Sequence, residues 1–306
     1  MEIRVLGSLG VRLCGVSVVP SAPKPRQVLA LLALRADHIV PAGVLAEELW
    51  SGRPPRSART TVQTYVLQLR DLIDRALAQG DGGPGASCAK DVLVTSAGGY
   101  MLNSGGGTVD LQEFDRLAGH GYRAMDGGDF PLAARQLGDA LALWRGAAFA
   151  DVPLGGQLAV ESKRLEESRL CALDQRIEAD LRLGRHRVLL AELTVLVDRY
   201  RTHESLHGQY MIALHRSGRR GEALEAYQRL RNTLVRELGM EPSVGLRRLQ
   251  RSILLAGPER AADRPAEREP AAMAVGAPAG MPAAVPAGVP GGVPVGPAAA
   301  RLSRVG

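Results

Sequence analysis

Threonine and glutamine side chains that could bind base edges gather in the segment PPRSARTTVQTYVLQLR, Pro54 to Arg70. At the helical turn of about 100° per residue, Thr60, Gln63 and Thr64 lie on one side, where a surface helix usually carries Glu and Lys. Threonine and glutamine can both donate to and accept from base edges, and Leu67 could contact a thymine methyl group. This face predicts a helix that reads the major groove of DNA.

Basic side chains border this face where the phosphates of a duplex would lie. They are Arg53, Arg56, Arg59 and Arg70. Phosphate contacts position a protein on DNA without specifying the sequence. Asp71 opposes such contacts, unless its carboxylate accepts from a cytosine amine or pairs with Arg70 or Arg75. For an isolated segment, the alternative to DNA binding is a helix face that is simply solvated. The order of the surrounding elements distinguishes these two interpretations.

A metal-binding pattern also occurs in the sequence. The segment HESLH, His203 to His207, matches H-E-x-x-H, which on a helix places two imidazoles for zinc and Glu204 as a base. Five-residue patterns arise by chance, and no convincing third ligand follows. The glycine-rich SGGGT, Ser104 to Thr108, lacks the Gly-Lys-Ser/Thr of a phosphate-binding loop and indicates an interdomain linker. The sequence shows no Ser/His/Asp or Cys/His grouping typical of nucleophilic catalysis. We therefore expect no enzyme, no catalytic residue, no metal and no cofactor. A zinc hydrolase is the alternative.

The elements around 54–70 follow the order of a winged helix. The sequence predicts strands at Glu2–Gly7, Gly10–Cys14 and Val16–Val19, helices from Lys24, at Pro41–Trp50 and at Ser57–Leu77, and a β-hairpin at Asp91–Asn103. A narrow apolar stripe predicts the buried side of the third helix, and it consists of Val62, Val66, Leu69 and Ile73. In this architecture the third helix enters the major groove and the hairpin lies beside the duplex. The order therefore favours DNA binding over a solvated face.

Helical periodicity continues from Val109, with short breaks that contain glycine. The segment ALHRSGRRGEALEAYQRL has the alternation of small and large residues of a tetratricopeptide unit. From Pro258 the composition is rich in Ala, Pro, Gly and Val, which predicts a disordered tail. We expect a mainly α chain: an α+β winged helix-turn-helix domain at 1–104, an all-α tetratricopeptide-like domain at 109–257, and the tail at 258–306.

The bulk composition fits a polyanion as partner. The chain has 306 residues and a formal net charge of +6, a basic excess that suits nucleic-acid binding without establishing it. Its three cysteines suit neither a disulfide framework nor a zinc site. Met1 leads into a strand pattern, and no apolar run approaches the ~18 residues of a membrane span. We expect a cytoplasmic, nucleoid-associated protein with no membrane partner.

Ordered blocks across about Glu2–Ala256 resemble the Streptomyces antibiotic regulatory proteins, a family of pathway-specific transcriptional activators. The blocks are KPRQVLALLAL, VLAEELWSGRPPRSARTTVQTYVLQLRDLI, LVTSAGGYML, VDLQEF, ALALWRGAAFADV, RLEESRL, ADLRLGRH and HRSGRRGEALEAYQRLRNTLVRELGMEPSVGLRRLQRSIL. The resemblance implies an OmpR-type winged helix followed by a bacterial transcriptional activation domain. It also implies a homodimer on direct repeats of double-stranded DNA, and recruitment of RNA polymerase holoenzyme through its sigma factor, with no dependence on nucleotide.

Candidate residues follow from the pattern and the resemblance together. Bases are expected to meet Thr60, Gln63, Thr64 and Gln68. The DNA backbone is expected to meet Lys24, Arg26, Arg56, Arg59 and Arg70, and the hairpin residues Gly99 and Tyr100. The resemblance implies that polymerase faces the loop of Trp50, Ser51, Gly52, Arg53, Pro54 and Pro55. A protein-interaction scaffold built on the helical repeats and a repressor of the same class are the alternatives.

Overall fold

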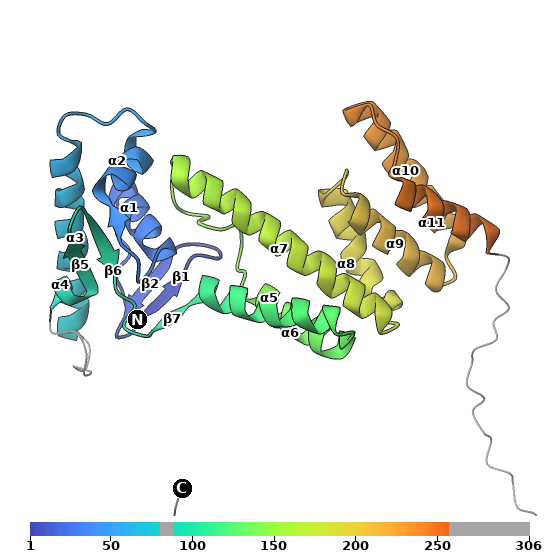
Figure 1. Ribbon diagram of the computed structural model, residues 1–306, viewed down its shortest axis with the longest axis horizontal. Coiled ribbons are helices and arrows are strands. Elements are labelled where there is room, and N and C mark those ends of the chain that lie inside the picture. The colour runs from blue at the N-terminus through green and yellow to red at the C-terminus, as the bar shows by residue number, and fades with distance from the viewer. Residues whose placement is uncertain (80–87, 257–306) are drawn as a thin grey trace, which may run out of the picture. The chain divides into compact units, whose positions relative to one another are not determined.

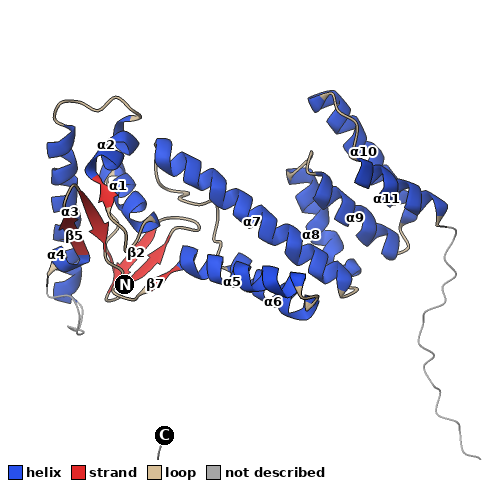
Figure 2. Ribbon diagram, viewed as in Figure 1, coloured by secondary structure: helices blue, strands red, loops and turns tan. Residues whose placement is uncertain are grey.

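The computed structural model describes residues 1–79 and 88–256, and within them the chain is mainly helical with two small sheets near the N-terminus (Figure 1, Figure 2). The mainly α fold class predicted from the sequence is confirmed. The predicted tail at 258–306 lies outside the described residues. Among the helices of the described ranges, none combines the length and the apolar character that crossing a membrane requires.

The first sheet joins the two ends of the N-terminal region. Its strands are β1 (Glu2–Arg4), β2 (Gly10–Leu13), β3 (Val16–Ser17) and β7 (Thr108–Val109), in the order β3-β2-β1-β7. The first three are antiparallel as predicted, although shorter. The sequence had assigned Ser104–Thr108 to a linker, whereas β7 pairs in parallel with β1. Gly107 is required there, because a Cβ atom would overlap the carbonyl oxygen of Met1.

Three helices and a hairpin form the winged helix. They are α1 (Pro23–Leu34), α2 (Ala42–Trp50), α3 (Ala58–Gln79), and the hairpin β5 (Leu93–Ser96) and β6 (Gly99–Leu102). The sequence missed the short helix α4 (Ala89–Val92) and the short strand β4 (Val40–Pro41), which extends the hairpin into a sheet of order β4-β6-β5. Val40 becomes part of a strand because it pairs with Tyr100.

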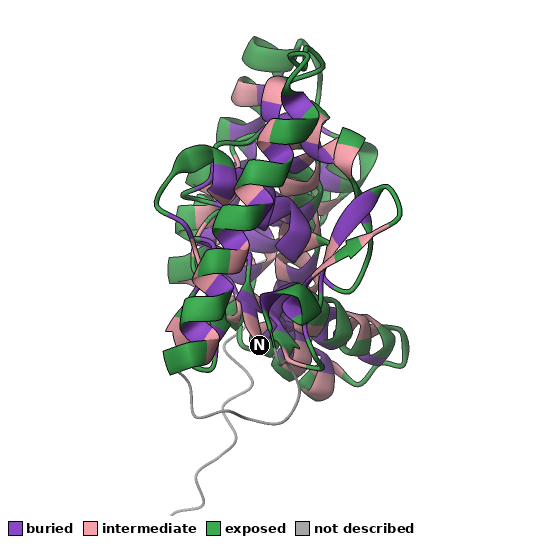
Figure 3. Ribbon diagram, turned by 90° about the vertical axis from the view of Figure 1, so that its left-hand side faces the viewer, coloured by how far each residue is buried: buried purple, intermediate pink, exposed green. Residues whose placement is uncertain are grey.

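Helix α3 has one buried and one exposed side. The predicted stripe of Val62, Val66, Leu69 and Ile73 is confirmed, since none of the four is more than 2% exposed. Ser57 directly precedes the helix, and its carbonyl accepts from the N–H of Thr61 at 2.9 Å. Figure 3 views the molecule from the side of α3, and exposed residues run along the outward surface of that helix.

Between β7 and residue 256, where the described part of the chain ends, seven helices pack against one another in sequence. They are α5 (Asp110–Asp126), α6 (Phe130–Ala142), α7 (Gly156–Arg182), α8 (His186–Arg199), α9 (Glu204–Arg216), α10 (Arg220–Leu238) and α11 (Val244–Leu255). Local capping sets some of their starts: Asp129 accepts from the N–H of Leu132 at 3.0 Å, and Ser243 accepts from that of Leu246 at 3.4 Å.

The hydrophobic core crosses the boundary between the winged helix and these helices. One cluster includes Ile3 and Ile73 of the N-terminal region together with Phe114 of α5 and Leu165 of α7. A second cluster lies among α7 to α11. The winged helix and α5–α7 therefore share buried apolar surface, which favours their joint folding.

Candidate nucleic-acid interface

The outward face of α3 carries the side chains that the sequence predicts as base readers. Thr60, Gln63, Thr64 and Gln68 are all exposed. Leu67 lies among them with 59% of its surface exposed, where it is accessible to a thymine methyl group. Asp71 is exposed, and no ion pair within the described residues involves it. The predicted face is thus uncharged along its first three turns.

One hydroxyl on this face is already oriented by the helix. The Oγ1 atom of Thr64 donates to the carbonyl oxygen of Thr60 at 3.0 Å, and Thr61 makes the same bond to Ser57. Because the single hydroxyl proton is used within the helix, Thr64 presents acceptor lone pairs outward. In this rotamer it suits an amino group on a base edge, as adenine and cytosine offer in the major groove.

The side chains of the arginines next to the face make no hydrogen bond or ion pair with any other residue that the structure describes. The side chains of Arg53, Arg56 and Arg59 are exposed, and within the described residues they make neither a hydrogen bond nor an ion pair. A cavity of about 550 Å³ is lined by two of them, Arg56 and Arg59. It is bounded by Pro54–Arg56, the first turns of α3, the start of α2 and the tip of the hairpin. Free guanidinium groups at the rim of this hollow suit phosphate oxygens.

Two other side chains that were predicted to contact the DNA backbone are bonded to groups inside the protein. Arg70 donates to the carbonyl oxygen of Leu93 at 2.7 Å and to the Oγ1 atom of Thr95 at 2.7 Å, so it ties the hairpin to α3. Lys24 donates through Nζ to the carbonyl oxygen of Leu49 at 2.6 Å. The structure thus shows internal partners for two cations that the sequence predicts at phosphates.

The remaining predicted contacts also have structural partners. Arg26 forms an ion pair with Asp151 at 3.2 Å, between the winged helix and the loop before α7. Gly99 and Tyr100 are buried, and a Cβ atom on Gly99 would overlap the carbonyl oxygen of Val40. Gly99 therefore permits the close approach of β4 to β6.

A buried carboxylate that the sequence analysis missed connects α2 to α7. Glu48 is 1% exposed, and its oxygens accept from the backbone N–H groups of Gly155 at 2.6 Å, Gln157 at 2.8 Å and Leu158 at 3.0 Å. Gln27 donates to it at 2.9 Å. Glu48 lies three residues after Leu45, on the buried side of α2, and this spacing was the signal available in the sequence. The carboxylate serves α7 as an N-cap from a distant part of the chain.

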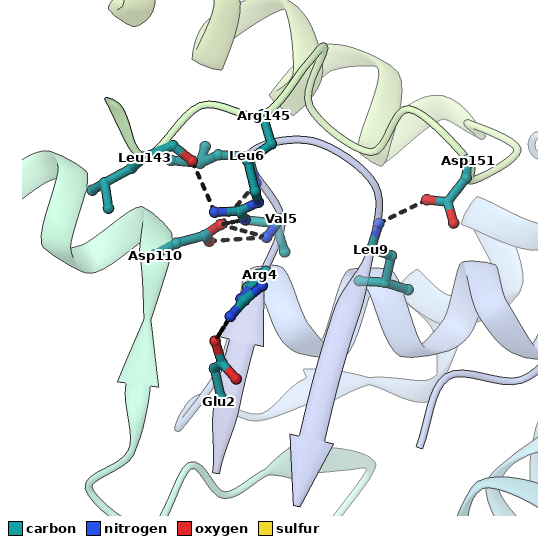
Figure 4. A network of polar contacts seen from close by, with 9 residues as sticks. All are labelled: Glu2, Arg4, Val5, Leu6, Leu9, Asp110, Leu143, Arg145 and Asp151. Atoms are coloured by element: carbon teal, nitrogen blue, oxygen red, sulfur yellow. Dashed lines mark hydrogen bonds and ion pairs between the residues drawn. The ribbon is translucent and has the colours of Figure 1, made fainter. Parts of the chain in front are cut away.

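A second buried carboxylate fixes the first sheet to α5 (Figure 4). Asp110 accepts from the N–H groups of Val5 at 2.9 Å and Leu6 at 3.1 Å, and it pairs with Arg145. Asp151 accepts from the N–H of Leu9 at 2.7 Å. These bonds hold the loop between β1 and β2, so helices beyond residue 109 help to position the winged helix.

The HESLH segment is used in helix capping. The Nδ1 atom of His203 accepts from the N–H of Leu206 at 3.3 Å, and Glu204 accepts from the N–H of Ser243 at 2.8 Å. Burial lowers the pKa of His207 to about 4. Over the described ranges no group of three or more His, Cys, Asp or Glu side chains could hold a metal ion. Of the residues in the zinc alternative, His203 and Glu204 thus serve as acceptors at the starts of helices.

Comparisons with known proteins agree with this architecture. Residues 109–254 match the family described as bacterial transcriptional activator domain. Regulatory protein DnrI of Streptomyces peucetius is 50% identical over 275 residues, which are 90% of this chain and 99% of that protein. Regulatory protein AfsR of Streptomyces coelicolor is 36% identical over 259 residues, 84% of this chain and 24% of that protein. The structure of Mycobacterium tuberculosis EmbR in complex with a low affinity phosphopeptide superposes with a TM-score of 0.74 at 32% identity, and covers 83% of this chain and 64% of that one.

Proposed function

The chain belongs to the Streptomyces antibiotic regulatory protein family of transcriptional regulators, and on this premise we propose that it activates an antibiotic biosynthetic gene cluster. It binds direct repeats near the promoter through its winged helix and recruits RNA polymerase. The observation that carries this proposal is the exposed, uncharged polar face of α3 beside arginines that have no partner among residues 1–79 and 88–256. Such a face can satisfy its hydrogen bonds on base edges while the arginines neutralise phosphates.

The exposed candidates divide into two roles. Thr60, Gln63, Thr64 and Gln68 read bases. Arg56 and Arg59 hold the backbone, because their side chains are exposed and unpaired at the start of α3. Arg70 acts by positioning, since its bonds to Leu93 and Thr95 set the distance between the hairpin and α3. Lys24 and Arg26 act in the same indirect way, through their bonds to Leu49 and Asp151.

The loop between α2 and α3 is proposed to face polymerase. Ser51 to Pro55 are all exposed, and Trp50 before them is half-buried. Ser51 and Gly52 both adopt positive φ angles, 50° and 81°, which turn the chain sharply out of α2. Pro54 and Pro55 then limit the freedom of the chain before α3 begins. A stiff, exposed loop adjacent to the DNA-reading helix supports contact with the sigma factor of a polymerase bound downstream.

A mobility-shift series with the full chain tests DNA binding. The full chain is needed because β7 and Asp110 complete the N-terminal sheet from outside residues 1–104. We expect a shift on upstream direct repeats that is stronger than on scrambled DNA, with two protein copies per pair of repeats. If no sequence shifts at low salt, the proposal fails and the helical repeats act as a protein-interaction scaffold.

Transcription with purified polymerase tests the direction of the effect. We expect more transcript from a promoter that carries the repeats, and no change when the repeats are scrambled. Less transcript from the same template would identify a repressor. Replacing Pro54 and Pro55 by Ser should lower transcription while the mobility shift is preserved, because these residues lie outside the base-reading face.

A further inference from the structure

A groove in the second half of the chain has no role in the proposed DNA contacts. Its volume is about 700 Å³, and α8, α9 and α10 line it. Helix α9 packs against both α8 and α10, so it forms the floor between two walls. Binding sites for small molecules in proteins occupy roughly 300–1,000 Å³. The groove therefore has the size for a small ligand.

The charge on the groove is mostly positive. Three arginines line it, Arg201, Arg229 and Arg236, against one carboxylate, that of Asp198. The arginine side chains are 58%, 63% and 68% exposed. Their ion pairs lie at the surface: Arg201 and Arg236 share Glu237, at 4.0 and 3.2 Å, and Arg229 lies 3.8 Å from Glu225. Exposed pairs of this kind contribute little free energy, so the guanidinium groups are available to an incoming anion.

A buried histidine lies at the floor of the groove with unsatisfied polar atoms. His207 is 7% exposed, and neither ring nitrogen has a hydrogen-bond partner of acceptable geometry, although the carbonyl groups of Tyr200 and Val197 lie beside the ring. Buried polar atoms without partners are uncommon in folded proteins and call for an explanation. Tyr210 lines the groove beside it, and its hydroxyl accepts from Thr194 at 3.3 Å.

We propose that the groove between α8 and α10 binds a small organic anion that carries phosphate or carboxylate groups. The arginines hold the charged groups by forked hydrogen bonds. The side-chain amide of Asn232 can donate to oxygens of the ligand backbone, and His207 gains a partner when the ligand closes over the floor. The hydroxyls of Thr194 and Thr233 donate to the carbonyl oxygens of Leu190 and Arg229, so they offer acceptor lone pairs to hydroxyl groups of the ligand. Val195, 67% exposed, and Leu230 supply an apolar side to the same groove. The site does not depend on the proposed DNA binding.

Calorimetry with the full chain tests this site, with pyrophosphate and citrate as separate probes at constant ionic strength and potassium chloride as the reference salt. We expect at least one probe to bind with a Kd tighter than about 1 mM. Tighter pyrophosphate binding identifies a phosphate-bearing ligand, and tighter citrate binding identifies a carboxylate-bearing one. The ring signals of His207 should shift on addition of that probe.

Paired variants separate a built site from general attraction. Replacing both Arg229 and Arg236 by Gln should weaken binding at least about tenfold, since each removes a charge-assisted hydrogen bond. The control replaces Arg219 and Arg231 by Gln. These arginines pair with Glu222 and Glu241 and lie outside the groove, so the change should be less than about twofold. Equal weakening by both pairs would overturn the proposal.

Two further results would also overturn the proposal. One is the absence of any binding heat at about 10 mM of either probe, a concentration that would reveal even very weak affinity. The other is a hexamer of glutamate that binds more tightly than both small anions, because the groove would then receive an acidic peptide. The variant His207→Gln tests the contribution of the buried ring. If this variant binds the probe as tightly as the native chain, His207 does not contact the ligand, which contradicts the proposed site.

Discussion

The carboxylate of Glu48 on α2 accepts a 2.6 Å hydrogen bond from the backbone N–H of Gly155, the residue that precedes α7. Two further N–H groups at the start of α7 donate to the same carboxylate. Helix α2 immediately precedes the loop that leads into α3. One side chain therefore couples the start of the longest helix to the part of the winged helix that leads to the base-reading face.

Replacing Glu48 by Ala should destabilise the whole chain. The substitution leaves three N–H groups, two of them buried, without their acceptor, at a cost of about 2–4 kcal/mol, while the amide of Gln27 keeps its bond to the carbonyl oxygen of residue 48. Urea unfolding followed by circular dichroism measures this loss. The neighbouring Glu47 is exposed, so Glu47→Ala should change the free energy of unfolding by less than about 0.5 kcal/mol. Equal effects of the two substitutions would contradict the role of Glu48.

Gly155 should tolerate no side chain. A Cβ atom there would overlap the carbonyl oxygen of Glu48, whereas a Cβ atom on the next residue, Gly156, meets nothing within 4 Å. We expect Gly155→Ala to cost about 1–3 kcal/mol, because overpacking forces backbone shifts. Gly156→Ala should be neutral or stabilise by up to about 1 kcal/mol, since alanine favours the first helical turn. Thermal unfolding of the two variants, measured in parallel with the native chain, gives both changes in stability.

These contacts also show which parts of the structure local sequence patterns reveal. The buried stripe of α3 depends only on helical periodicity, and so Val62 to Ile73 were predicted correctly. Strand β4 and strand β7 exist through pairing with distant segments, and no local pattern in the sequence indicates either of them. Glu48 lies on the buried side of α2, but the sequence around it does not show which groups its carboxylate will bind. Its burial depends on N–H groups 107 residues away in the chain.

The difference between local pattern and distant contact also applies to the cations at the candidate interface. A residue type predicts affinity for phosphate, but it does not tell whether a carbonyl oxygen of the protein already occupies the group. Arg70 donates to the carbonyl oxygen of Leu93, and Lys24 donates to that of Leu49. Arg56 and Arg59 make no such bond to the residues that the structure describes. The contact of all four side chains with DNA stays a prediction, and the exposed side chains of Arg56 and Arg59 should be tested first.

Arg56 and Arg59 should each contribute to affinity for every DNA sequence. Replacing either by Gln removes one phosphate contact, so the slope of log affinity against log salt should become shallower by about 0.9. The ratio between specific and scrambled DNA should stay constant. The control is Arg187→Gln on α8, which removes an exposed and unpaired arginine far along the chain and should leave the slope unchanged. Titrations over a range of salt concentrations give both numbers.

Thr64 should influence which sequence is bound. Its hydroxyl presents acceptor lone pairs outward, so Thr64→Ala removes discrimination at one base pair, worth about 1–3 kcal/mol. Selection from a randomised operator library, read by sequencing, reports the change. Thr61→Ala removes a hydroxyl with the same internal bond from a half-buried position and should leave the selected sequence unaltered. Loss of affinity without a change of preference would assign Thr64 to backbone contact instead.

His207 should make stability depend on acidity. Burial lowers its pKa from the ordinary 6.5 to about 4, so the folded chain favours the neutral ring. That stabilisation is complete above pH 6.5 and is lost as the pH falls from 6.5 through 4, by up to about 3 kcal/mol. We expect the difference in unfolding free energy between the native chain and His207→Gln to shrink by that amount over this range. The control is His120→Gln, which replaces an exposed histidine of α5 and should follow the native pH profile. A constant difference between the native chain and His207→Gln from pH 7 to pH 4 would show that the buried ring carries no such linkage.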